Sequence, residues 1–117
     1  MPVRIKRIYE PPSRGDGYRV LIDGIWPRGT TRERAAVDQW ARELAPSAQL
    51  RRWYGHDPER FEEFARRYRA ELGAQRERLS ELRRWSRTRV VTLVFAARDA
   101  EHSNATVLAD VLRRGPR

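Results

Sequence analysis

Three short segments of the chain carry the apolar and β-branched positions that are typical of strands. They run from Val3 to Tyr9, from Tyr18 to Asp23 and from Arg89 to Ala97. The third, centred on residues 90–95, has the strongest strand pattern. In the second, the run Val20-Leu21-Ile22 favours burial on both faces of a sheet. We therefore predict a sheet of about three strands.

A loop rich in proline and glycine, Glu10 to Gly17, separates the first two strands. Its eight residues fall short of the roughly dozen or more that a parallel crossover usually needs. If these two strands are neighbours, we expect them to pair antiparallel, which would make the sheet mixed.

Helix signals fill most of the space between the second and third strands. Thr30 and Glu33 have capping-box spacing, which predicts a helix that begins there and ends at Pro46. Its apolar face would comprise Val37, Trp40, Ala41 and Leu44.

Start and stop signals mark the remaining helices. One begins at the cap Ser47 and ends at Gly55. The next begins at Asp57-Pro58, runs through Leu72 and continues past Gly73 to Trp85. A last helix has the apolar residues Ala105, Leu108, Val111 and Leu112 and is closed by Gly115-Pro116. Strands that alternate with helices predict an α/β fold. We expect one domain over residues 1–117, a small helix-covered mixed sheet of about three strands with four to five helices.

Composition narrows the classes of protein. The chain has no cysteine, which excludes disulfides, thiolate nucleophiles and cysteine metal sites. The longest apolar run, Val90 to Ala97, is far shorter than the ~20 residues of a membrane helix, and residues 1–7 do not resemble a signal peptide. We expect a cytoplasmic protein without membrane contact.

The formal net charge of +9 raises the question of nucleic acid, because basic surfaces bind phosphate backbones by releasing counterions. Lys6 is the only lysine, however, and enrichment in arginine with alanine is typical of GC-rich coding. Pairs such as Glu62 with Arg66 and Glu63 with Arg67 also have the spacing of a solvated helix face. Charge alone is therefore weak evidence for a partner.

Two loops follow strands and are rich in polar side chains. In open α/β sheets, ligands bind beyond the carboxyl ends of strands, where loops meet helix N-termini. Residues 23–29 follow the second strand and residues 98–104 follow the third. If the two strands run parallel, both loops emerge at one edge of the sheet and a site is expected there.

Four ordered motifs resemble a known family. They are residues 18–23, Trp26-Pro27-Arg28-Gly29, residues 53–58 and residues 95–104. Together they are similar to the YeaO-like family of bacterial proteins (domain of unknown function 488) over nearly the whole chain. The resemblance implies an α/β fold and a cytoplasmic bacterial protein, and it implies no activity. The family commonly has arginine where this chain has Gly24, so an anion bound by that arginine in relatives would bind less well here.

Trp26 and Arg28 are candidate ligand-binding residues. An arginine there can clamp a phosphate or carboxylate with two hydrogen bonds while the tryptophan stacks on a ring. Alternatively, Trp26 is a core residue and Arg28 pairs with an acid. Arg98 and Asn104, in the other loop, are further candidates for ligand binding.

His56 and His102 are the only two histidines, and histidine titrates near neutral pH. Asp99 precedes His102 by three residues, so with Asn104 it can orient that imidazole for proton transfer, assisted by His56. Alternatively, His56 fixes its turn, and Asp99 caps the last helix with His102 in the first turn.

We expect neither a metal nor a cofactor. His56, His102, Asp23 and Asp99 would suit zinc or manganese, but they lack the close spacing of known motifs. Gly15-Asp16-Gly17 precedes a strand, the wrong context for a phosphate-binding glycine loop.

Three hypotheses remain. The one we favour is a site at the strand ends for a small anionic, phosphorylated ligand, in a binding protein or an acid–base enzyme. The second is a nucleic-acid-binding module that uses its arginines with Trp26, Trp53 and Tyr54 as stacking surfaces. The third is a protein-interaction domain with charged helices.

Overall fold

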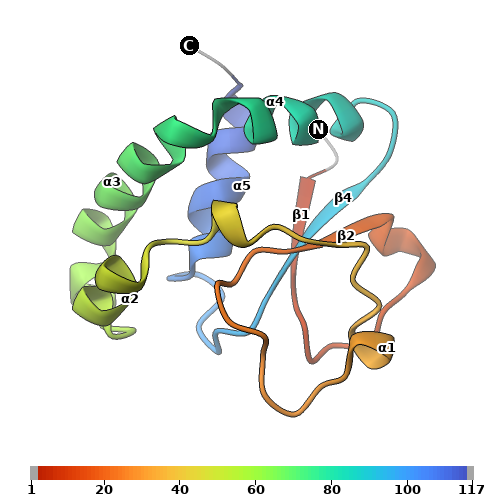
Figure 1. The fold of residues 1–117 in the computed structure, drawn as a ribbon, viewed down its shortest axis with the longest axis horizontal. Helices are drawn as coiled ribbons and strands as arrows, with labels where there is room; N and C mark the ends of the chain where they lie inside the picture. The colour runs from red at the N-terminus through yellow and green to blue at the C-terminus, as the bar shows by residue number, and fades with distance from the viewer. Residues whose placement is uncertain (1–2, 116–117) are drawn as a thin grey trace.

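All four strands of the sheet run parallel, in the order β1-β4-β2-β3 (Figure 1). A computed structural model describes residues 3–115. The strands are β1 (Val3–Arg7), β2 (Tyr18–Leu21), β3 (Gln39–Trp40) and β4 (Val91–Phe95). In the register of the sheet, Leu93 of β4 lies between Ile5 and Val20, so β4 is a central strand.

The predicted α/β class is confirmed, with two differences in the sheet. Within residues 3–115 there are four strands rather than about three, and every pairing is parallel rather than mixed. The first two strands are not neighbours because β4 inserts between them. The expectation of antiparallel pairing therefore does not apply to them.

Residues 8–17 cross over one face of β4 to reach β2. The carbonyl of Asp16 accepts a hydrogen bond of 2.6 Å from the hydroxyl of Thr92, which holds the segment against that strand. Gly17 has a φ of 62°, and a Cβ on it would lie 2.3 Å from the carbonyl oxygen of Val90. Only glycine fits this close approach, which lets a short segment make the crossing.

Apolar side chains on the two faces of the sheet enter separate clusters. Val20, Ile22 and Leu93 belong to the main core, whereas Leu21 and Val94 belong to a smaller cluster on the opposite face. Because successive strand residues point to opposite faces, burial of both faces explains the unbroken apolar runs.

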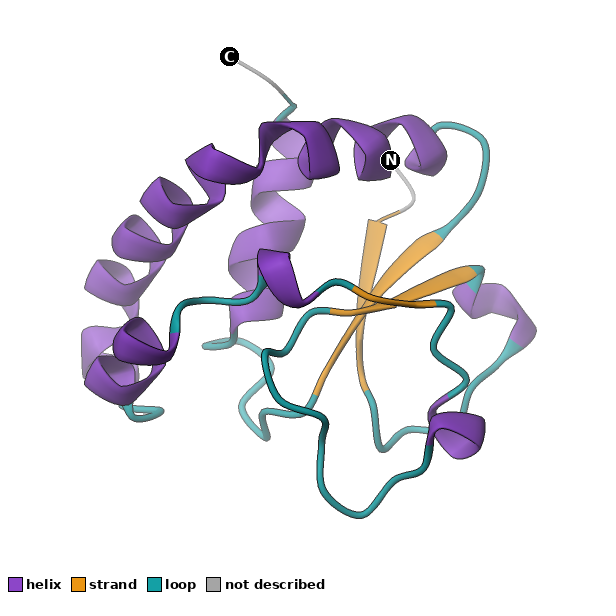
Figure 2. Ribbon diagram, viewed as in Figure 1, coloured by secondary structure: helices purple, strands orange, loops and turns teal. Residues whose placement is uncertain are grey.

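Helices cover the two faces unequally (Figure 2). The main core receives side chains from α2 (Ala48–Tyr54), α3 (Phe61–Leu72), α4 (Arg76–Ser86) and α5 (Asn104–Arg114). The opposite face is covered by loops and the single turn of α1 (Arg32–Ala35). None of the helices within residues 3–115 has the length and apolar character needed to cross a membrane.

Several predicted helix ends are confirmed. The hydroxyl of Ser47 accepts from the backbone N–H of Leu50, and Gly55 ends α2 with a φ of 54°. Asp57 caps a 3₁₀ turn, Pro58–Arg60, that leads into α3. A second such turn, Gly73–Gln75, carries the chain from α3 into α4 without a break. Gly115 follows α5, and Pro116 lies outside the described residues.

The helix predicted between Thr30 and Pro46 is wrong for most of its length. The N-cap is Thr31, and α1 ends at Ala35, followed by the C-cap Ala36, whose φ is 48°. The chain then forms β3 and a 3₁₀ turn, Arg42–Leu44. Trp40, the last residue of β3, packs in the smaller cluster, and Ala41, which follows it, packs in the main core. The apolar spacing that matches a helix here arises because the segment passes along the edge of the sheet and contacts both faces.

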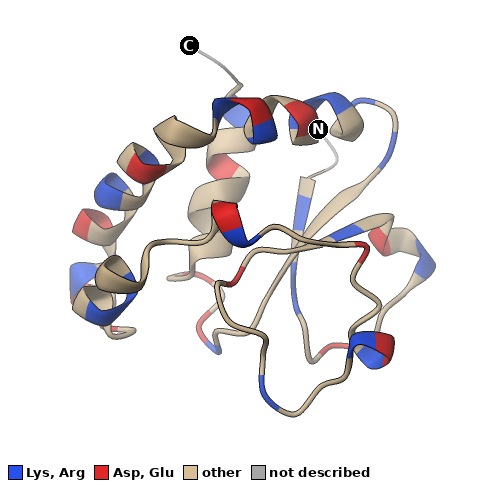
Figure 3. Cartoon of the chain, in the orientation of Figure 1, with Lys and Arg blue, Asp and Glu red and all other residues tan. Residues whose placement is uncertain are grey.

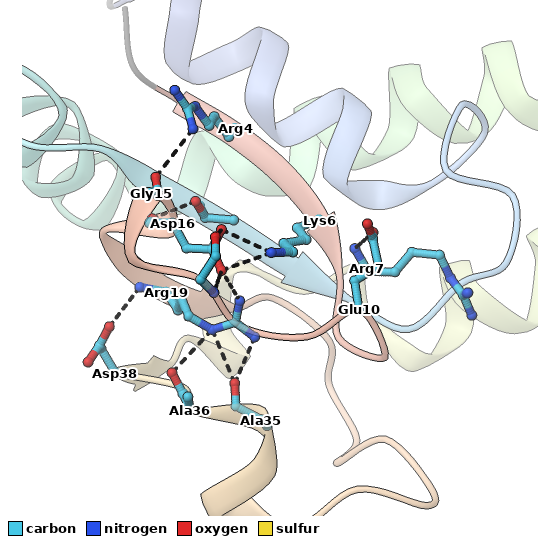
Figure 4. A network of polar contacts seen from close by, with 12 residues as sticks. Arg4, Lys6, Arg7, Glu10, Gly15, Asp16, Arg19, Ala35, Ala36 and Asp38 are labelled. Carbon is cyan, nitrogen blue, oxygen red and sulfur yellow. Dashed lines mark hydrogen bonds and ion pairs between the residues drawn. The ribbon is translucent and has the colours of Figure 1, made fainter.

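A buried carboxylate ties together the face of the sheet that lacks long helices (Figure 4). Asp16 accepts from Lys6 at 3.1 Å, from Arg19 at 2.7 Å and from the backbone and hydroxyl of Ser13. Burial raises the pKa of Asp16, but these hydrogen bonds outweigh it and lower the pKa to about 2. Arg19 also donates to the carbonyl of Ala35, so the network joins β1, β2 and α1.

Candidate anion-binding pocket

A pocket opens at the carboxyl ends of β2 and β4, where the chain leaves two neighbouring strands toward opposite faces. After β2 it turns to the face of the smaller cluster, where Trp26 packs. After β4 it turns to the main core through α5. In open parallel sheets this divergence creates the crevice in which ligands bind.

The pocket has a volume of about 520 Å³, within the usual range for small-molecule sites. Its lining combines a mostly apolar wall with cationic and polar side chains. The lining residues are Asp23, Gly24, Ile25, Pro46, Ala48, Arg51, Arg52, Tyr54, His56, Phe64, Ala96, Ala97, His102, Ser103 and Asn104.

Arg51 and Arg52 reach the pocket from α2. Arg51 is half-buried, and its Nε has no hydrogen-bond partner among the described residues. A buried guanidinium nitrogen without an acceptor is costly. None of the ion pairs within residues 3–115 involves Arg51, so no acid holds its guanidinium. Arg52 is exposed at the same wall.

The sequence interpretation missed these two arginines. A signal was present: no acidic residue stands three or four positions from either Arg51 or Arg52, unlike Arg66 and Arg67. The sequence did not reveal that α2 lies beside the ends of β2 and β4.

Asp23, directly after Ile22, is the one acid among the residues that line the pocket. Its carboxylate accepts from the backbone N–H of Ala96 at 3.0 Å and from Nδ2 of Asn104 at 3.4 Å. Burial raises the pKa of Asp23, and those hydrogen bonds with the charges of Arg51 and His56 offset the rise only in part.

His102 lines the pocket and pairs with Asp99, as the sequence suggested. Nδ1 of His102 lies 2.7 Å from Oδ2 of Asp99, and this hydrogen bond lowers the pKa of Asp99. The ring meets that of Phe61 edge-on with centroids 5.1 Å apart. Both residues precede α5, whose N-cap position is Ser103, so the alternative in which Asp99 caps that helix is wrong.

His56 also lines the pocket, at its exposed margin. It has a φ of 57°, the left-handed region that only a few per cent of non-glycine residues adopt. Its ring centroid lies 6.2 Å from that of Tyr54, whose hydroxyl donates to the carbonyl of His102 at 2.6 Å. Tyr54 thus connects the loops that carry the two histidines.

The N-terminus of α5 forms part of the pocket wall. The Ser103 hydroxyl donates to the carbonyl of Ala100 at 2.8 Å and does not cap the helix. Asn104, the first residue of α5, donates to the carbonyl of Ile22 at 3.0 Å, which ties the helix to the end of β2. First-turn N–H groups without a capping side chain favour a negative charge nearby.

Three of the predicted ligand-binding residues do not line the pocket: Trp26, Arg28 and Arg98. Trp26 packs edge-on against Trp40 at 5.4 Å, and its Nε1 donates to the carbonyl of Thr30 at 2.9 Å. Its alternative assignment as a packing residue fits these contacts.

The guanidinium groups of Arg28 and Arg98 lie at exposed positions. Neither makes an ion pair with residues 3–115, and the carbonyl of Arg28 accepts from the Tyr9 hydroxyl at 2.8 Å. The loop after β2 turns toward the opposite face beyond Ile25, so Asp23 and Gly24 reach the pocket and Arg28 does not.

Gly24 stands beside Arg51. A Cβ at this position would lie 3.6 Å from the Cβ of Ala45 and 3.8 Å from the guanidinium carbon of Arg51, both ordinary contact distances. Position 24 therefore accepts a side chain, and an arginine there would stand next to Arg51 at the pocket.

Comparison with known proteins assigns the family. The sequence model of the "inactive DUF488-N3 subclade" matches residues 2–115. An uncharacterised protein of Mycobacterium tuberculosis (strain H37Rv) is 47% identical over 110 residues, which cover 94% of this chain and 92% of that protein. The uncharacterised protein YeaO of Escherichia coli K12 is 34% identical over 113 residues, which cover 97% and 98%. No solved structure matches the chain significantly. The chain belongs to the DUF488 family, as a YeaO-like member of that subclade.

Proposed function

We propose that this protein binds a small anionic molecule, with a phosphate or carboxylate group, in the pocket at the ends of β2 and β4. The observation that carries the proposal is the set of cationic or protonatable side chains there, Arg51, Arg52, His56 and His102, against the single acid Asp23. Such a set favours a negative charge, and the fork of a guanidinium matches the oxygens of a phosphate or carboxylate.

Two further features support an anion. Arg51 lines the pocket and takes part in no ion pair within the described residues, so no bonded acid neutralises its charge. The N-terminus of the eleven-residue helix α5 adds a partial positive charge at the same wall.

Binding without turnover is the better-supported form of the proposal. The matching family model is described as an inactive subclade, and the pocket offers one histidine, His102, with an orienting carboxylate. The pair of His102 with Asp99 nevertheless makes acid–base catalysis the second candidate. Asp99 bonds Nδ1 of the ring, so the other ring nitrogen, Nε2, can transfer a proton to or from a ligand. His102→Gln tests the second candidate, which requires turnover to be lost while most of the phosphate binding is retained.

Nucleic-acid stacking is less well supported because the aromatic faces proposed for it are occupied. Guanidinium groups of Arg60 and Arg67 lie 5.4 and 4.2 Å from the ring of Trp53. Tyr54 is buried against Phe64, with ring centroids 4.3 Å apart. A base would have to displace these contacts before it could stack.

Isothermal titration with inorganic phosphate and pyrophosphate tests the proposal. We expect Arg51→Met to weaken binding by about 10-fold or more, since a hydrogen bond to a charged group contributes roughly 1.5–3 kcal/mol. The melting temperature should be unchanged or higher, because methionine removes the unpartnered buried nitrogen.

Arg87→Met is the matched control: Arg87 is exposed at the end of α4, before β4 begins, at the opposite edge of the sheet. Equal loss of affinity in both variants would show diffuse attraction to a basic surface and would contradict a specific pocket.

A further inference from the structure

Asp23 is an unexpected group for a pocket that binds only an anion. Its carboxylate lines the same cavity as Arg51 and Arg52, and a bare phosphate there would be repelled by it. The presence of Asp23 therefore indicates that the ligand has a second feature besides its negative charge. This argument rests on the proposed function.

The carboxylate has unused capacity to accept hydrogen bonds. Each of its oxygens accepts one bond from the protein, Oδ2 from the N–H of Ala96 and Oδ1 from the amide of Asn104. An ionised carboxylate offers about four lone-pair sites, so roughly two remain for donors from a ligand. The same two bonds hold Asp23 in place, because Ala96 follows β4 and Asn104 begins α5.

The charged groups of the pocket come from different elements. Asp23 stands at the end of β2, whereas Arg51 and Arg52 come from α2. The lining of the same pocket also includes apolar side chains, among them Phe64 and Ile25, the latter 63% exposed. A ligand that spans the pocket would place one end at each polar group.

We infer that the ligand is a sugar phosphate, free or within a mononucleotide, whose phosphate meets Arg51 and Arg52 and whose hydroxyls donate to Asp23. A neutral hydroxyl group donates a hydrogen bond to a carboxylate, and neither group changes its charge. In doubly wound α/β folds an acid at a strand end accepts sugar hydroxyls in this manner, which shows that the chemistry suits such a crevice.

Matched ligands test the inference on the unmodified protein. The probes are ribose 5-phosphate, adenosine monophosphate, 2′,3′-dideoxyadenosine monophosphate and inorganic phosphate, each titrated by calorimetry at one ionic strength. We expect adenosine monophosphate to bind at least about 10-fold more tightly than its dideoxy analogue, because the analogue leaves Asp23 without its donors. Comparison of ribose 5-phosphate with adenosine monophosphate then shows whether the base contributes.

Asp23→Asn should reduce that preference to within about threefold and leave the affinity for inorganic phosphate unchanged or higher. Asp110→Asn, on the outer surface of α5, is the control and should keep the preference. Gly24→Leu, whose Cβ fits beside Arg51, should weaken every probe by filling the pocket.

The outcomes separate this inference from the proposed function. If inorganic phosphate binds through Arg51 but the two nucleotides bind equally, the assignment to Asp23 is overturned and anion binding stands. If none of the four probes binds, neither stands. The preference of the unmodified protein for adenosine monophosphate over its dideoxy analogue tests the inference even if the Asp23→Asn variant does not fold.

Discussion

Asp16 and Asp23 show how surroundings give one side chain two different roles. Asp16 is met by Lys6, Arg19 and the backbone of Ser13, and these hydrogen bonds overcome its burial and lower its pKa to about 2. Asp23 has fewer donors, and burial raises its pKa. The first carboxylate is matched by partners within the fold, whereas the second keeps capacity for a ligand.

Asp16→Ala should lower the free energy of unfolding by about 3–5 kcal/mol, because it leaves Arg19, 3% exposed, without its counter-charge. Urea denaturation monitored by circular dichroism measures the loss. Asp110→Ala, which breaks ion pairs on the surface, is the control and should cost under about 1 kcal/mol.

The same carboxylate sets a dependence on pH. Its folded pKa of about 2 lies below the ordinary value of 3.8, so its contribution is complete above pH 4 and is lost as the pH falls toward 2. The loss amounts to up to about 2 kcal/mol. An Asp16→Ala protein whose stability fell over this interval as steeply as that of the unmodified protein would refute the assignment.

At the level of elements, the segment from Trp26 to Trp40 serves the fold rather than the site. It covers the face of the sheet that lacks long helices, with Trp26 and Trp40 packed on each other beside Leu21 and Val94. The guanidinium of Arg32 lies 5.2 Å from the Trp26 ring, which further encloses it.

Trp26→Ala should therefore lower the free energy of unfolding by roughly 2–4 kcal/mol, somewhat less than for a fully buried tryptophan. Phosphate affinity, measured by titration on the folded variant, should change less than twofold because Trp26 does not line the pocket. Loss of phosphate binding with an unchanged free energy of unfolding would instead show that Trp26 is a ligand-binding residue.

For the whole molecule, the charge of +9 arises from basic residues that alternate with acidic ones along the chain (Figure 3). On α3, for example, Glu63 pairs with both Arg66 and Arg67. Such a surface attracts polyanions over a long range without reading their sequence.

We accordingly expect a single-stranded oligonucleotide to bind weakly and without sequence preference. Its affinity should fall by about 10³ or more between roughly 50 and 200 mM salt, and Arg51→Met should change it little. Fluorescence anisotropy measures both effects. Tight binding that persists at the higher salt and prefers one sequence would favour the nucleic-acid hypothesis over the pocket.

Local signals along the chain were enough to predict most elements and the edge of the sheet that carries the pocket. The strand runs, the cap Ser47 and the stop Gly55 each depend on a residue and its near neighbours. They also indicated His56, His102 and Asn104, which the folded chain brings into one pocket. Chain direction was sufficient here, because loops that follow parallel strands emerge at one edge.

Contacts between distant segments settled the rest. The insertion of β4 between β1 and β2 follows from burial over the whole chain, which no local window contains. For the same reason the spacing of Val37, Trp40, Ala41 and Leu44 suggested a helix although the segment lies along a sheet edge. Arg51 and Asp23 line one pocket and Arg28 does not, and this depends on how α2 and the loop after β2 pack. Short-range patterns in the sequence carry no information about packing partners, so they could not predict it.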